Sequence, residues 1–279
     1  MPIVTFWSNS EKTIGQTVAA SITAATMAME HNYKILLISA DVYNDSMEGC
    51  FGSQLSNKNL LKSIISTPQI NIDNGINGLI KMAKSNRITP EIIKDYTKII
   101  YKNRLEVLYS STNNEFALEE QMEYFKNIIL NASKYYDYVI VDLKKGIKSE
   151  NTFKILDLSD VVVLNTEQGT KTLKGFFKIP EAKNIVNNQK FIWNICKYDP
   201  KSKYNVKNIT RTIWKRKPIY SLSYNTLIFE SSSEGNLPET LLRLRTIKSD
   251  EESKKILEEA KQLIQGIQLK QHELQMRMG

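Results

Sequence analysis

The chain has 279 residues, of which 41% are hydrophobic and 24% charged, the balance of a globular protein long enough to bury a sizeable core. No apolar run approaches the roughly 18 residues that span a bilayer, and no signal peptide opens the chain, so we expect a cytoplasmic protein without a transmembrane segment. Two cysteines and two histidines show no metal-binding spacing. The net charge of +8 permits nucleotide, nucleic acid or acidic lipid as partner without selecting one.

The first predicted elements are a strand over residues 3–7, a short polar turn, and a helix over about residues 15–32. A phosphate-binding loop reads GxxxxGK[ST] between such elements, and here the window reads Ser10-xxxx-Gly15-Gln16-Thr17. The second Gly and the metal-binding hydroxyl are present, whereas the first Gly and the Lys are missing. Gln16 offers an amide donor but no positive charge, which predicts bound nucleotide with slow hydrolysis. The alternative is an ordinary strand-to-helix turn.

If the loop holds a nucleotide, its candidate binding residues are those of the turn and the start of the helix. They are Ser10, Glu11, Lys12, Thr13, Ile14, Gly15, Gln16, Thr17 and Val18.

An apolar run over residues 35–39 predicts a second strand, buried on both faces as in a parallel sheet. Together with the preceding strand and helix it forms a right-handed βαβ unit. The run ends at Asp41. A carboxylate at the carboxyl end of a parallel strand lies where ligands bind in open α/β sheets.

Periodicity is weak between residues 44 and 104. Short helices are expected near Leu60 and Leu79, and a longer helix begins at Pro90 and includes Ile99 and Ile100. We expect a helical insertion over about residues 52–104 that covers one side of the sheet. The alternative is that it carries partner specificity.

A further apolar strand, residues 136–142, ends in Asp142 and matches the Walker B pattern, in which the carboxylate lies near Mg²⁺ or its water. Gly146 follows after three residues, where a Gly lets the backbone approach a terminal phosphate. Three nucleotide-type elements thus occur in the expected order at strand ends.

Other strands are predicted at about residues 105–109, 160–165, 189–194 and 219–222. The total of seven or eight, mostly separated by helices, predicts an α/β fold. It is a mostly parallel, doubly wound sheet with helices on both faces, in three layers. This domain would span residues 1–248.

Residues 197–217 contain eight Lys or Arg and one acid, interleaved with aromatic residues. This composition suits nucleic-acid binding or a solvated surface near an anionic ligand. Residues 249–279 form a predicted C-terminal helix, in which six basic and six acidic residues cancel when counted from Lys248. Such a helix packs on its own domain or on a second subunit rather than on a membrane surface.

The order of these motifs resembles the deviant-Walker P-loop ATPases that include MinD and ParA, and most of all the TadZ or CpaE branch, which helps place and assemble Tad (Flp) pili. The resemblance covers about residues 1–245. It rests on residues 3–17, 35–41, 136–147, 197–200 and 224–235. Many members of that branch carry a receiver-like domain before the first strand, and we expect none in this protein.

The resemblance implies a homodimer that sandwiches ATP or ADP with Mg²⁺. Thr17 would hold the metal directly, Asp142 would hold it through water, and Asp41 would be the catalytic acid of switch I. Switch II would include Gly146.

The resemblance also places the nucleobase. It would lie near Lys197, Tyr198 and Asp199 on one side and Tyr224 and Asn225 on the other.

The chain departs from the family at its charged positions. The family loop reads KGGxGK[ST], and Glu11 occupies the place of the signature Lys, with Lys12 beside it. Lys144 and Lys145 fill the usual Pro-small segment of switch II. We hypothesise that these lysines supply the charge that the loop lacks.

The leading hypothesis is an ATP-binding protein with weak or absent hydrolysis, a localisation or assembly factor for a Tad-type pilus at a cell pole or the inner membrane face. A ParA-like, DNA-binding partition ATPase is the alternative. A third interpretation is an active ATPase in which Lys12 or Lys144 replaces the loop lysine.

Overall fold

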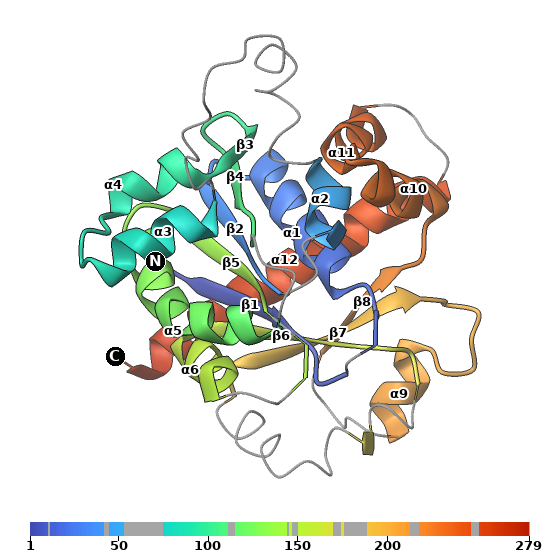
Figure 1. The fold of residues 1–279 in the computed structure, drawn as a ribbon. Coiled ribbons are helices and arrows are strands. Elements are labelled where there is room, and N and C mark those ends of the chain that lie inside the picture. The colour runs from blue at the N-terminus through green and yellow to red at the C-terminus, as the bar shows by residue number, and fades with distance from the viewer. Residues whose placement is uncertain are drawn as a thin grey trace.

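A computed structural model of the chain is shown in Figure 1. It describes residues 1–10, 12–41, 45–52, 75–110, 115–143, 145–146, 150–169, 174–175, 189–212, 218–246 and 251–278. The described residues form an eight-stranded sheet in the order β3-β4-β2-β5-β1-β6-β7-β8. The strands are β1 Ile3–Trp7, β2 Ile35–Ala40, β3 Lys98–Tyr101, β4 Leu105–Leu108, β5 Tyr138–Leu143, β6 Val161–Thr166, β7 Phe191–Tyr198 and β8 Ile219–Ser223.

Seven of the strands run parallel, and only the edge strand β3 is antiparallel to its neighbour β4. Every position of β1, β2, β5 and β6 is buried, which explains their continuous apolar runs. The register pairs Phe6 of β1 and Ser39 of β2 with Asp142 of β5. The carboxyl ends of these three strands therefore meet at one edge of the sheet.

Helices cover both faces of the sheet (Figure 1). On one face lie α1 Gln16–Glu30, α2 Asp45–Phe51, α10 Thr226–Glu234, α11 Leu237–Thr246 and α12 Glu251–Met278. On the other lie α3 Ile76–Lys84, α4 Pro90–Ile93, α5 Glu115–Ala132, α6 Glu150–Leu158 and α9 Val206–Thr212. The predicted three-layer α/β fold is confirmed. None of the helices in the described ranges is long and apolar enough to cross a membrane.

The helix α1 lies close to the sheet because its buried face is made of small residues. Ala20, Ala24 and Ala25 are fully buried, and most of the helix is covered by neighbouring elements. This close packing fixes the direction in which the amino end of α1 points, toward the carboxyl edge of the sheet.

The predicted helical insertion is wrong at its carboxyl end. The helix that begins at Pro90 ends within two short turns, α4 and the 3₁₀ helix η1 Lys94–Tyr96, and Lys98–Tyr101 forms strand β3. Ile99 is exposed, and the strand pairs with β4 across a register shift between Ile99 and Tyr101. Adjacent β-branched residues at the sheet edge favour a strand over the helical spacing that was predicted. Leu60 and its neighbours, residues 53–74, lie outside the described residues.

The C-terminal helix α12 packs on its own sheet, against β8, β7 and β6, and against α1. Leu263, Ile264 and Ile267 are buried in the same core as α1. Gly266 faces Tyr220 of β8 so closely that a Cβ at this position would lie 2.2 Å from Cζ of the ring. Of the two places left open for this helix, the structure shows the intramolecular one.

Candidate functional site

The candidate site lies at the carboxyl ends of β1, β2 and β5, where the predicted loop and the two predicted carboxylates come together. Gly15 adopts φ +90° and precedes the first turn of α1, which receives no side-chain cap. The backbone amides of an uncapped helix start favour an anion. Gly is favoured here because residues with a side chain rarely adopt this φ. An added Cβ would also lie 3.5 Å from Cε of Lys197.

The side chain of Gln16 is fully buried and points into the sheet edge. Its Nε2 donates to Oδ1 of Asp142 at 2.7 Å and to the carbonyl oxygen of Leu143 at 2.7 Å. Both partners are acceptors, so the amide orientation is determined by its surroundings. The donor that was expected to serve a phosphate instead ties α1 to the end of β5.

Asp142 is 1% exposed, and its carboxyl has a shifted pKa. Burial raises the pKa of its carboxyl from 3.8 to about 6, while hydrogen bonds from Gln16 and Thr17 oppose that shift. The nearby charge of Asp41 raises the pKa further and that of Lys145 lowers it. The pKa of Asp142 therefore depends on a group of neighbours, which with Asp142 we call the carboxylate group: Thr17, Asp41 and Lys145.

The second carboxylate, Asp41, lies at the end of β2 and is 6% exposed. Its Oδ2 is 3.9 Å from Nζ of Lys145. Gly146 adopts φ +86°, and its N–H donates to the carbonyl oxygen of Ser8 at 2.8 Å. The amide predicted to approach a phosphate is thus bonded to the end of the first loop, and a phosphate contact would require that bond to break.

The remaining loop residues are arranged around this group. Thr17 is buried beside Asp142, Ile14 is buried, and Lys12 and Thr13 are exposed. Ser10 accepts a hydrogen bond from the backbone of Lys12. Glu11 and Lys144 lie outside the described residues.

The predicted nucleobase residues divide into two groups. Lys197, Tyr224 and Asn225 line a pocket together with Gly15 and Val18. Lys197 adopts φ +51°, and its Nζ donates to the carbonyl oxygen of Thr13 at 3.2 Å, so its side chain lies over the loop.

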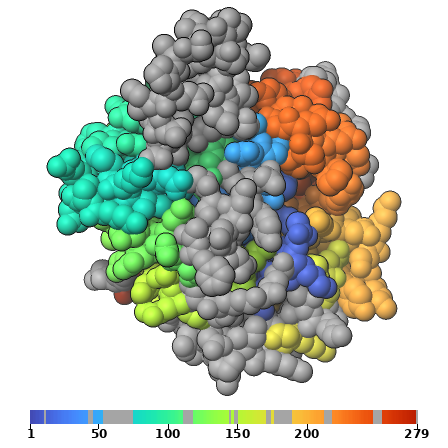
Figure 2. Space-filling view, in the orientation of Figure 1, coloured from blue at the N-terminus to red at the C-terminus, as the bar shows by residue number. Residues whose placement is uncertain are grey.

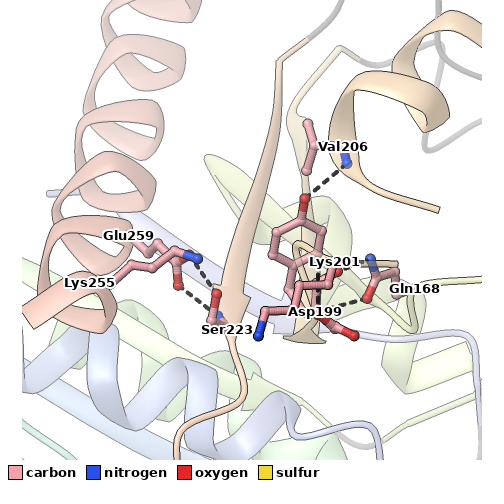
Figure 3. Close-up of polar contacts among 8 residues, drawn as sticks. Gln168, Asp199, Lys201, Val206, Ser223, Lys255 and Glu259 are labelled. Carbon is pink, nitrogen blue, oxygen red and sulfur yellow. Dashed lines mark hydrogen bonds and ion pairs between the residues drawn. The ribbon is translucent and has the colours of Figure 1, made fainter. Parts of the chain in front are cut away.

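Tyr198 and Asp199 do not line this pocket. The Tyr198 hydroxyl accepts from the backbone N–H of Val206, and the ring joins the core on the opposite face. The backbone of Asp199 exchanges two hydrogen bonds with the side chain of Gln168, as Figure 3 shows for the labelled residues. A register shift between β7 and β8 at residues 195–198, together with the left-handed Lys197, breaks the strand alternation and turns these side chains away.

The structure also identifies a residue that the sequence did not suggest. Glu259 of α12 accepts from both the N–H and the hydroxyl of Ser223, at 2.7 and 2.6 Å, directly before Tyr224 and Asn225 (Figure 3). Asn225 then caps α10 through Ile228 N–H at 3.1 Å. No local pattern signals Glu259, because its partner is 36 residues away.

The donor set fits a hard cation and fits a nucleotide only in part. The Thr17 hydroxyl and Asp142 carboxylate are adjacent oxygen ligands of the kind that Mg²⁺ prefers. Oε1 of Gln16 is buried without a hydrogen-bond partner in the described residues, and an acceptor there suits a cation or water rather than phosphate oxygen. The amides of α1 suit phosphate, but the ammonium of a standard loop is missing.

No family model matches the sequence, and no curated protein matches it significantly. Solved structures do match the fold. A ParA family ATPase from Chlorobium tepidum aligns with TM-score 0.64 and 15% identity, over 93% of this chain and 98% of that one. A Borrelia burgdorferi plasmid partition protein bound to AMPPNP gives TM-score 0.59 and 16% identity over 97% and 99%.

The septum site-determining protein MinD of Pyrococcus horikoshii, complexed with Mg-ADP, gives TM-score 0.61 and 12% identity over 96% of this chain and 98% of that one. These identities are low, so the likeness concerns architecture. It extends over nearly the whole of each structure. The chain therefore has the fold of the ParA and MinD ATPases.

Proposed function

We propose that this chain is a nucleotide-binding protein of the ParA and MinD type, which holds ATP or ADP with Mg²⁺ and hydrolyses it weakly or not at all. The observation that carries the proposal is the bond from Gln16 to Asp142 at the end of the loop. The Walker B carboxylate and the loop meet as a nucleotide site requires, yet a neutral amide takes the place of the ammonium.

Each residue of the group has a role in this proposal. The amides at the start of α1 would bind phosphate, and Gly15 keeps them accessible. Thr17 and Asp142 would hold Mg²⁺, the latter through water, and Mg²⁺ would neutralise phosphate charge. Asp41 would orient the attacking water. The base would lie in the pocket of Lys197, Tyr224 and Asn225.

Slow hydrolysis follows from charge. Phosphoryl transfer is catalysed chiefly by positive groups placed around the transferred phosphoryl. Gln16 donates hydrogen bonds without charge, and it must release Asp142 and Leu143 before it can donate to a ligand. Two effects, a missing cation and a competing intramolecular contact, therefore oppose catalysis.

Equilibrium titration with a fluorescent ATP analogue, with and without Mg²⁺, tests the nucleotide half of the proposal. We expect saturable binding that strengthens with Mg²⁺, and phosphate release no faster than in an Asp41→Ala variant. No binding at millimolar nucleotide would refute it. Faster release in wild type would instead support an active ATPase that uses Lys12 or Lys144.

For the biological role we propose a homodimeric localisation or assembly factor for a Tad-type pilus, in the cytoplasm and recruited to a cell pole or the inner membrane face. The support is the resemblance of the motif order to the TadZ and CpaE branch. Native mass spectrometry of the purified chain measures subunit number and bound nucleotide together. A monomer at every concentration, with or without ATP, would contradict the dimer.

A ParA-like DNA-binding function is the alternative, favoured by one observation. Lys201, Lys203, Lys207 and Arg211 are exposed on and before α9. Phosphate-dominated DNA binding weakens steeply with salt, so a nonspecific duplex titrated from low to high salt distinguishes the two functions. Retention at low salt with a steep slope supports partition, and no retention excludes it.

A further inference from the structure

The segment that follows β5 is fixed directly against the end of β1. The N–H of Gly146 donates to Ser8, and the indole Nε1 of Trp7 donates to the carbonyl oxygen of Gly146 at 3.2 Å. Trp7 is fully buried, so this anchor is part of the core. Its effect is to hold the preceding residue, Lys145, beside the first loop rather than out in solvent.

The side chain of Lys145 points into the candidate site. It is 15% exposed, and its Nζ lies 3.9 Å from Oδ2 of Asp41, whose side chain is 9% exposed. This distance fits an ion pair but is too long for a hydrogen bond. The contact with Asp41 therefore uses none of the N–H donors of the ammonium. A cation so far buried needs an anionic partner, and a carboxylate at this range satisfies it incompletely.

Other lysines near the loop are placed differently. Lys197 is exposed, and its ammonium is directed to the carbonyl oxygen of Thr13 on the base side of Gly15. Lys12 is exposed. Of these three lysines, Lys145 is the one that pairs with Asp41 and whose charge lowers the pKa of Asp142.

We propose that Lys145 supplies the positive charge that the loop lacks, and that it binds the terminal phosphate of the nucleotide after exchanging Asp41 for that phosphate. The inference rests on the proposed nucleotide-binding function. It predicts that Lys145 distinguishes ATP from ADP, because only ATP carries the terminal phosphate.

The test compares Lys145→Met, Lys145→Arg and a matched control, Lys154→Met. The control removes an exposed lysine on α6 whose Nζ lies 3.1 Å from Oε1 of Glu150. Fluorescent ATP and ADP analogues are titrated against each variant and wild type. Loss of a charge-assisted contact predicts about tenfold weaker ATP binding for Lys145→Met. ADP affinity should change little, Lys145→Arg should retain most ATP affinity, and the control should match wild type.

A second variant should change ATP affinity in the opposite direction. Asp41→Asn removes the competing carboxylate, so ATP binding without Mg²⁺ should strengthen, and this gain should vanish in the Asp41→Asn, Lys145→Met double variant. If Lys145→Met binds ATP as tightly as wild type does, and likewise ADP, the inference is overturned while the proposed function stays intact. Wild type that binds neither nucleotide would overturn both.

Discussion

Nε2 of Gln16 lies 2.7 Å from Oδ1 of Asp142, across 126 residues of sequence. The contact closes the loop onto the strand that carries the second nucleotide motif. It also leaves the carboxylate bonded to an uncharged donor where a loop lysine would provide an ammonium. This relationship makes the loop weak toward anions, whereas burial raises the pKa of the Asp142 carboxyl against the effect of the Gln16 hydrogen bond. Each of these properties can be measured.

The first prediction concerns the replacement of Gln16 by Lys. The ammonium would neutralise Asp142 and reach a phosphate, so ATP affinity should rise by about 1–2 kcal/mol, the value of a charge-assisted hydrogen bond. Titration of the fluorescent ATP analogue measures the change. Gln262→Lys, on an exposed position of α12, adds the same charge elsewhere and should have no effect. Unchanged affinity in Gln16→Lys would mean that the loop does not touch phosphate.

The second prediction follows from the pKa of Asp142. Because burial raises it from 3.8 to about 6, the folded state binds this proton more tightly than the unfolded state does. The contribution of this group to stability therefore falls as pH rises from about 4 to 6 and stays low above that range. Asp142→Asn removes the buried charge and should stabilise the fold at pH 7.5 by about 1–3 kcal/mol.

Urea denaturation at pH 4, 5, 6 and 7.5 measures this difference. The advantage of Asp142→Asn should shrink to near zero at pH 4, whereas the exposed Asp157→Asn should show no such trend. An Asn variant that is equally or less stable than wild type at every pH would contradict the assignment of burial as the dominant cause.

The third prediction uses the contact between Gly266 and Tyr220. Gly→Ala inside a helix usually stabilises by about 1 kcal/mol. Here the new Cβ would lie within 2.6 Å of three atoms of the Tyr220 ring, so overpacking should cost about 1–3 kcal/mol and reverse the sign. Thermal or urea unfolding of Gly266→Ala measures it.

A double variant provides the control for this contact. In a Tyr220→Leu background the added methyl has room, so Gly266→Ala should become neutral or stabilising. Destabilisation of equal size in both backgrounds would mean that the ring is not the obstacle.

The fourth prediction concerns Glu259, which holds Ser223 through two hydrogen bonds. Glu259→Ala should loosen the loop that carries Tyr224 and Asn225, and should weaken ATP binding by about threefold to tenfold, the cost of ordering such a segment on binding. Glu258→Ala, its exposed neighbour, is the matched control. Competition by tripolyphosphate, which lacks a base, should be unaffected; an equal loss would assign Glu259 to general stability.

The sequence predicts most of the sheet because its strands are buried on both faces. Runs such as residues 35–38 are fully apolar for this reason, and their order with the intervening helices determines the parallel topology. It fails at β3, which is an edge strand with exposed Ile99 and no such run. Its isoleucines fit a helix as well as a strand, and only pairing with β4 decides between them.

The sequence predicts that the candidate residues cluster at one edge of the sheet, but it does not predict their contacts. The motifs place Gly15, Thr17, Asp41 and Asp142 at one edge of the sheet because parallel strands end together. The direction of the Gln16 amide depends on acceptors more than a hundred residues away. The turn of Tyr198 away from the pocket and into the core of the opposite face depends on a local register shift. Neither feature leaves a pattern in the sequence.

A backbone contact joins the helix α2 to the end of α10. Gly235 N–H donates to the carbonyl oxygen of Gly49 at 2.6 Å, and a Cβ at Gly235 would lie 2.8 Å from Cα of Gly52. Figure 2 shows α2, in light blue, directly beside the orange surface of α10 and α11. No side chain stands between these two backbones to absorb a displacement.

The strands that lead into α2 and α10, β2 and β8, lie on opposite sides of β1 and do not touch. The glycine contact therefore joins α2, which lies between β2 and β4 in the chain, to the end of α10, which Asn225 caps. We expect a bulky residue at Gly49 to break this contact, because a Cβ there would lie 2.6 Å from the carbonyl oxygen of Ser232. Faster hydrogen exchange in α10 would report the break. Under the proposed function, backbone contact within one chain would then link the phosphate side of the site to the base side.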